Sequence, residues 1–140
     1  MSVANDALIE SVKRIMAQAK ESGLDAGYQG YRELFTSAPF AGYRVEDQRQ
    51  ALKLMVLMKG APNPPTPAMT EAHRAALGLL SALVSSHAEP ADHELLGVCH
   101  LVLGDEASAA TVFRAGLALE RERDPQSKLC GALMKRVSMV

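Results

Sequence analysis

Residues 91–117 decide the fold, and their sequence is ADHELLGVCHLVLGDEASAATVFRAGL. Apolar residues recur every three or four positions on both sides of Gly104, which is the spacing of one face of an α-helix. Gly104 can adopt the left-handed backbone conformation that a sharp turn needs, and the small residues Gly97 and Ala109 let two helices approach closely. The segment therefore predicts two helices, over residues 91–103 and 106–123, that pack as an antiparallel hairpin.

Helical spacing also recurs outside this hairpin, whereas no segment alternates apolar and polar residues as a strand does. Asn5 and Asp124 are candidate N-caps, and Gly23 and Gly60 follow two of the predicted helix ends. We therefore expect an all-α fold. The five further helices are predicted over residues 5–22, 25–37, 45–59, 67–87 and 125–138.

Residues 61–67, with the sequence APNPPTP, connect the helices predicted over 45–59 and 67–87. Proline lacks the backbone N–H that a helix needs, so this stretch predicts a stiff, extended, polyproline-like connection. Thr66 can cap the helix that follows, and Pro67 suits its first position.

The seven predicted helices form three pairs and leave one over. A helical hairpin cannot bury its apolar face alone, whereas stacked hairpins bury a continuous core. We therefore expect a single domain of residues 1–140 with hairpins over 5–39, 44–89 and 91–123. The amphipathic helix over 125–138 would cap the otherwise exposed end of the stack.

The hairpin over 91–123 carries a spaced set of residues, which consists of Leu96-Gly97, His100, Gly104, Ala109, Phe113 and Gly116. This set resembles a tetratricopeptide repeat (TPR). Weaker matches to the same pattern occur at Gly27, Tyr31, Leu34 and Pro39 in the first hairpin, and at Ala76 and Leu80 in the second. The resemblance implies a right-handed stack of TPR-like hairpins closed by the capping helix.

In TPR-like stacks the first helix of each hairpin lines a concave groove, and the resemblance places eight residues of this chain there. The helix over 5–22 adds Val12, Met16 and Lys20. The lining is mostly apolar and lacks most of the Lys, Asn and Arg residues with which some TPR domains bind a C-terminal carboxylate. It suits an amphipathic helix or an extended apolar peptide. The groove residues are Gln50, Leu54, Leu57, Met58, Glu94, Val98, Leu101 and Val102.

An alternative is that these residues pack against the capping helix or a second copy of the chain. Three functions stay open on this basis. The first is an adaptor or scaffold that binds a partner protein. The second is a small secretion chaperone, since type III export systems use TPR-like proteins of similar size. The third is a self-associating structural subunit.

The composition argues against other partners. A formal net charge of −1, from 15 basic and 16 acidic residues, provides no excess positive charge for nucleic acid. The longest nearly apolar run, residues 77–84, is too short to insert into a membrane. Because no signal peptide is visible and Cys99 and Cys130 look like buried, reduced thiols, we expect a cytoplasmic protein.

The histidines and cysteines do not form a recognisable catalytic or metal-binding pattern. His93 and His100 lie seven residues apart on one helix, roughly 10 Å along its axis, which is too far for one zinc ion. His100 occupies a packing position of the repeat, so we expect a buried, hydrogen-bonded imidazole. Cys99 and His100 point about 100° apart on a helix and cannot form a catalytic pair. We expect no metal, no cofactor and no enzymatic activity.

Overall fold

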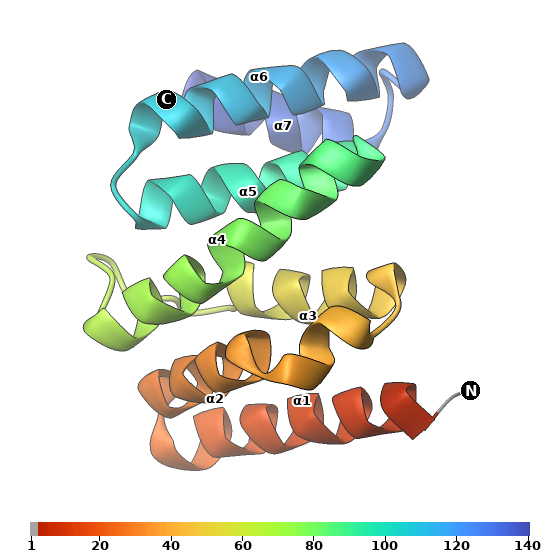
Figure 1. Ribbon diagram of the computed structural model, residues 1–140. Coiled ribbons are helices and arrows are strands. Elements are labelled where there is room, and N and C mark those ends of the chain that lie inside the picture. The colour runs from red at the N-terminus through yellow and green to blue at the C-terminus, as the bar shows by residue number, and fades with distance from the viewer. Residues whose placement is uncertain (1–2) are drawn as a thin grey trace. The chain divides into compact units, whose positions relative to one another are not determined.

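The computed structural model describes residues 3–140, and every regular element in that range is a helix (Figure 1). Helices take up 81% of the chain, so the all-α prediction is confirmed and no strand occurs within these residues. The α-helices are α1 (Val3–Ser22), α2 (Leu24–Thr36), α3 (Val45–Val56), α4 (Pro67–His87), α5 (Pro90–Val102), α6 (Glu106–Arg123) and α7 (Lys128–Ser138). A short 3-10 helix, η1 (Ala38–Gly42), was not predicted.

Some helix ends agree with the sequence prediction and others do not. α4 begins at Pro67, and the hydroxyl of Thr66 accepts the N–H of Met69 at 3.3 Å as an N-cap should. α1 begins at Val3, so Asn5 lies inside the helix and is not its N-cap. α3 ends at Val56, three residues before the predicted end at residue 59.

The start of α7 also corrects the prediction. Asp124 accepts the N–H of Gln126 at 3.1 Å within a turn, and Pro125 lies in that turn, not in the helix. The N-cap is Ser127, whose hydroxyl oxygen accepts the N–H of Cys130 at 2.9 Å. The same hydroxyl donates to the Glu120 carboxylate at 2.6 Å. Glu120 lies on the preceding helix α6, and this second bond holds the Ser127 side chain in the position from which it caps α7.

The chain divides into two compact units, residues 1–76 and residues 77–140, and the division falls inside α4. The first unit holds α1, α2, η1, α3 and the first half of α4. The second holds the rest of α4 with α5, α6 and α7. The prediction of one domain with three stacked hairpins stays a prediction.

In the first unit, α1 and α2 form a tight hairpin that turns at Gly23, whose φ of 97° favours glycine. Gly27 lies so close to α1 that a Cβ on it would be 2.7 Å from the Cβ of Ala19. A Cβ on Gly30 would be 2.8 Å from a side-chain carbon of Ile15. Two glycines one turn apart therefore let the two helices come into close contact.

An aromatic cluster fills the core beside this hairpin. η1 brings Phe40 into the interior, where it is fully buried with its ring centre 5.2 Å from that of Phe35 in an edge-on arrangement. Phe35 in turn stacks on Tyr31 at 5.7 Å. Such edge-on and offset pairs are favourable beyond the area that they bury. The loop after α2 is therefore part of the core, which explains why it is helical and not a free connection.

In the second unit, α5 and α6 pack closely through two glycines. The ring of Phe113 lies over Gly97, where a Cβ would be 2.2 Å from the ring. Gly116 lies against the backbone and Cβ region of α5, 2.6 Å from the Cβ of His93 by the same measure. Phe113 also belongs to a buried cluster with Cys130 and Leu133 of α7. This one ring of α6 therefore packs against both α5 and α7.

Candidate binding groove

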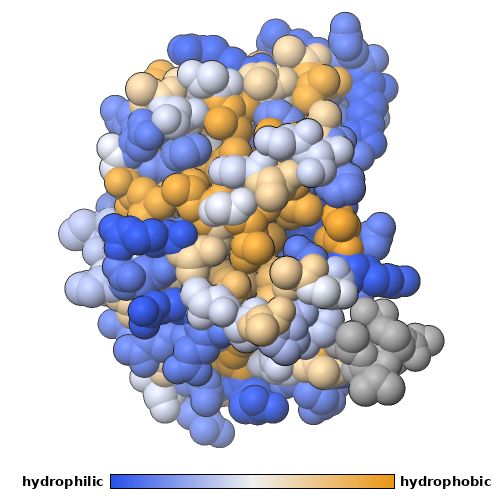
Figure 2. All heavy atoms as spheres, in the orientation of Figure 1, coloured by the Kyte–Doolittle hydropathy of each residue, from blue (hydrophilic) through white to orange (hydrophobic). Residues whose placement is uncertain are grey.

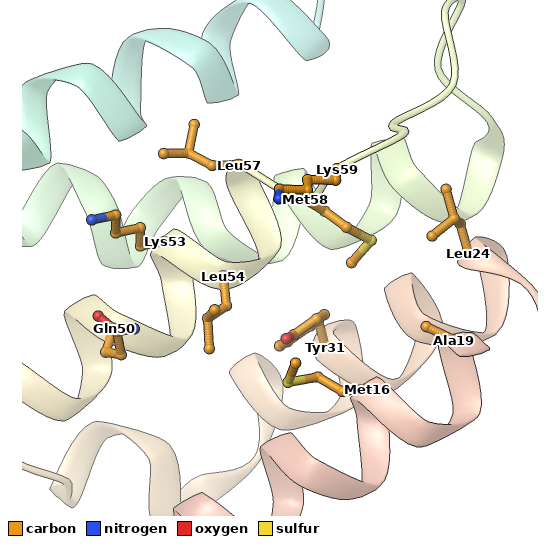
Figure 3. Close-up of a pocket in the computed structure, with 10 residues that line it drawn as sticks. All are labelled: Met16, Ala19, Leu24, Tyr31, Gln50, Lys53, Leu54, Leu57, Met58 and Lys59. Atoms are coloured by element: carbon orange, nitrogen blue, oxygen red, sulfur yellow. The ribbon is translucent and has the colours of Figure 1, made fainter. Parts of the chain in front are cut away.

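An apolar pocket of about 460 Å³ lies between α1, α2 and α3 in the first unit (Figure 3). Leu54 of α3 and Met16 of α1 point toward one another across it, with Tyr31 of α2 between them. A pocket of this size is in the range that binding sites occupy. Its lining consists of Met16, Ala19, Leu24, Tyr31, Gln50, Lys53, Leu54, Leu57, Met58 and Lys59.

A smaller pocket of about 170 Å³ continues this hollow along α1. Gln50 and Leu54 line both pockets, so the two are neighbours. We call the two pockets together the α1–α3 groove. The smaller pocket is lined by Leu8, Ile9, Val12, Lys13, Asp47, Gln50, Ala51 and Leu54.

The groove arises because α1 is apolar on two adjoining sides. Leu8 and Ile15 are buried, with 4% and 5% of their surface exposed. One position further along, Ile9 and Met16 are 42% and 53% exposed. A helix rotates by about 100° per residue, so neighbouring positions cannot both face the core. The first pair holds α1 in the fold, and the second pair is left in the groove.

α3 supplies the opposite wall in the same way. Leu52 and Met55 are fully buried, whereas Leu54 and Leu57 are only half-buried and line the larger pocket. Met58 follows the end of α3, and its methyl carbon lies 3.9 Å from the position of a Cβ on Gly27. Met58 therefore lies within ordinary contact distance of α2 at this end of the groove, and the close contact at Gly27 is the one with Ala19 of α1.

The charges at the groove are mostly positive. Lys13, Lys53 and Lys59 are exposed at its edges. The one acidic residue in the lining, Asp47, already forms an ion pair with Arg44 at 3.3 Å. The rim therefore presents free ammonium groups around an apolar floor. The surface of the first unit is otherwise mainly hydrophilic on the face that Figure 2 shows, with hydrophobic residues at few places.

The structure brings together one half of the residues that the resemblance placed in a groove. Gln50, Leu54, Leu57 and Met58 all line the larger pocket, as does Met16. Val12 lines the smaller pocket, and Lys20 is in the lining of neither. Whether a partner binds there stays a prediction.

The other half has a different environment. Val98 and Leu101 pack against the buried cluster of α6 and α7, and Glu94 accepts a bond from Arg136 of α7 at 3.1 Å. This is the alternative in which the α5 residues contact the C-terminal helix. Val102 is half-buried at the end of α5. We therefore restrict the candidate groove to the first unit.

Several lining residues were not found from the sequence, among them Ile9, Leu24 and Tyr31. Ile9, Val12, Met16 and Ala19 recur at intervals of three, four and three residues, which is the spacing of one helical stripe. That signal was present, but a second stripe through Leu8 and Ile15 has similar spacing. Only the packing of α2 shows which stripe is covered.

Two of the histidines contact backbone carbonyl groups of their own helices. Nδ1 of His73 lies 2.8 Å from the carbonyl oxygen of Met69, and Nδ1 of His93 lies 2.8 Å from that of Glu89. Burial lowers the pKa of His73, and its bond to the Met69 carbonyl opposes this shift. No group of three or more His, Cys, Asp or Glu residues within the described range 3–140 could hold a metal ion.

His100 and the two cysteines are the other residues that the sequence raised as candidates for chemistry. His100 is 18% exposed, and its Nδ1 lies 4.0 Å from the Asp105 carboxylate, which is too long for a hydrogen bond. The expected buried, hydrogen-bonded imidazole is therefore wrong, because α5 ends beside the exposed N-cap of α6. Cys99 and Cys130 are buried thiols that form no disulfide, as predicted. Burial raises the pKa of the Cys99 thiol to about 12, so it stays protonated and unreactive.

Comparisons with protein families, with curated proteins and with solved structures give no match to this chain. Among the helices over residues 3–140, none combines the length and the apolar character needed to cross a bilayer.

Proposed function

We propose that the chain is a protein-binding module whose α1–α3 groove holds an apolar segment of a partner protein. The observation that carries this proposal is the exposure of Ile9 and Met16, at 42% and 53%, beside the half-buried Leu54 and Leu57. Large apolar side chains that gather in a hollow on a protein surface usually mark a contact site. Methionine suits such a surface, because its flexible thioether adapts to different partners.

The TPR-like architecture is part of the same proposal. It is supported by the α5–α6 hairpin, in which Phe113 packs on Gly97 and Gly104 makes the turn with a φ of 84°. The α1–α2 hairpin uses Gly27 in a comparable close contact. In a stack of this type, α1 and α3 are the first helices of successive hairpins, so a groove between them is the expected binding surface.

We further propose that the module is not an enzyme and acts in the cytoplasm. Support comes from the thiol of Cys99, which burial keeps protonated, and from the bonds that tie His73 and His93 to their own helices. An adaptor and a secretion chaperone would both use the groove for another protein. A self-associating subunit would use it for a second copy.

The test compares two methionine variants with matched exposure. Met16→Glu places a charge in the groove, whereas Met134→Glu places one on α7, where Met134 is 48% exposed and lines no part of the groove. Helical peptides selected from a displayed library with the natural chain should bind Met16→Glu about tenfold or more weakly. They should bind Met134→Glu normally.

Melting temperatures accompany these measurements, and both variants should melt near the natural chain because both side chains are half exposed. Equal peptide binding by the natural chain and a folded Met16→Glu variant would show that the groove is not the binding site. An unfolded Met16→Glu variant would show that Met16 belongs to the core.

A further inference from the structure

We infer that the occupant of the α1–α3 groove is an amphipathic helix whose apolar stripe is flanked by acidic residues. This inference rests on the proposed function and adds the chemistry of the partner. Two observations carry it. One is the length and spacing of the apolar floor, and the other is the charge of the rim.

The floor fits a helix of about three turns. On α1 the stripe runs from Ile9 to Ala19, ten residues apart, which corresponds to about 15 Å of helix axis. Its intervals of three and four residues are those with which one helix packs along another. Leu54 on α3 and Leu57 at the C-cap of this helix are three residues apart and form the second wall. A helix laid between these walls would contact both and insert its own apolar side chains into the two pockets.

The rim selects the charge of the occupant. Lys13 stands at the α1 side of the groove, and Lys53 and Lys59 stand at the α3 side. A helix in the groove would therefore have ammonium groups along both of its edges. Asp47 is the only carboxylate in the lining, and Arg44 already neutralises it. Acidic residues on both flanks of the apolar stripe complement this pattern, and basic flanks are repelled.

The same charges disfavour a second copy of the chain as the occupant. In a twofold contact the same patch faces itself, so lysines of one rim would approach those of the other. The exposed part of α1 next to the stripe carries Lys13 and Lys20 together with Asp6 and Glu10, so an α1 helix inserted into the groove of another copy would bring mixed and not acidic flanks. A partner with acidic flanks avoids both problems.

The experiment uses two synthetic helical peptides with one apolar stripe in common. Both carry leucines at three- and four-residue spacing, and one has glutamates and the other lysines at the flanking positions. Binding to the full-length chain is measured by fluorescence anisotropy. We expect the glutamate peptide to bind about tenfold more tightly than the lysine peptide at low salt, with the difference shrinking as salt screens the charges.

A double variant tests whether the groove lysines cause this preference. Lys53→Glu combined with Lys59→Glu should abolish or reverse it. The control is Lys128→Glu combined with Lys135→Glu, which changes the net charge equally at two exposed lysines of α7. The control should preserve the preference for the glutamate peptide.

The outcomes separate the inference from the proposed function. If both peptides bind equally and Met16→Glu weakens both, the groove binds helices without regard to charge, and only the inference is overturned. If the groove and control double variants behave alike, the preference comes from overall charge, and the inference is again overturned. If neither peptide binds, both fail. A dimer in sedimentation that Met16→Glu dissociates would make a second copy the occupant and overturn the inference.

Discussion

At the scale of single residues, the first unit buries a histidine whose charge is opposed by its surroundings. His73 is fully buried on α4, and its ring centre lies 6.1 Å from that of Tyr28. Burial also raises the pKa of Tyr28, with the charge of Asp25 as a second cause. Both groups are therefore held in their neutral forms in the folded chain.

This arrangement predicts that the chain loses stability as the pH falls. The pKa of His73 is lowered in the folded state, so the unfolded chain takes up a proton first when the pH drops through the ordinary histidine value of about 6.5. Stability from this residue is thus full above that pH and is lost toward the lower, folded-state pKa. Urea unfolding between about pH 7.5 and pH 5 should show the decline.

His73→Gln should make that pH profile flatter, because a neutral side chain takes up no proton. His87→Gln is the matched control on the same helix, since His87 is exposed. A profile for His73→Gln as steep as that of the natural chain would mean that another group causes the pH dependence.

Ser127 gives a second residue-scale prediction. Its hydroxyl caps α7 and bonds to Glu120 of α6, so Ser127→Ala should lower the free energy of unfolding by about 1–2 kcal/mol. Asp124→Ala removes only a bond within the exposed turn and should cost less. Chemical denaturation of both variants decides the matter. If Asp124→Ala lowered the free energy of unfolding more than Ser127→Ala, Asp124 and not Ser127 would be the more important cap of α7.

At the scale of helices, close packing between α5 and α6 depends on glycine. Gly97→Ala should destabilise the chain by about 1–3 kcal/mol, because the new Cβ would lie within 2.7 Å of three ring carbons of Phe113. Gly131→Ala on α7 is the control, since a Cβ there meets nothing within 4 Å and alanine favours a helix by roughly 1 kcal/mol. Thermal unfolding should show opposite shifts for the two variants. Equal shifts would mean that the ring moves aside without cost.

Helix positions were predictable where the signal is local. α4 and α6 cover the predicted ranges, because Thr66-Pro67 and Gly104-Asp105 mark their starts within a few residues. The start of α7 could not be predicted, because both Asp124 and Ser127 can cap a helix. Which of them caps α7 depends on Glu120, which lies on another helix. η1 was missed for the same reason. It is held by Phe40 in an aromatic cluster, which no local pattern reveals.

At the scale of the whole molecule, apolar stripes could be located from the sequence but not divided into core and groove. Leu54 and Leu101 occupy comparable positions in two predicted hairpins. In the structure, Leu54 lines an open pocket, whereas Leu101 packs against a cluster that includes Leu133 of α7. The difference arises because α7 supplies a covering helix for α5, and α3 has a hollow beside it.

This contrast predicts that a glutamate substitution mainly lowers stability in the second unit and mainly weakens partner binding in the first. Leu101→Glu places a charge against the α6–α7 cluster and should lower the free energy of unfolding by about 2 kcal/mol or more, with binding lost only to the extent that the chain unfolds. Met16→Glu should leave the melting temperature nearly unchanged and weaken partner binding about tenfold or more. Both quantities are measured on both variants, with binding recorded well below the melting temperature of each. If Leu101→Glu stays fully stable and loses binding, then α5 faces the partner after all, and the groove assigned to α1 and α3 is incomplete.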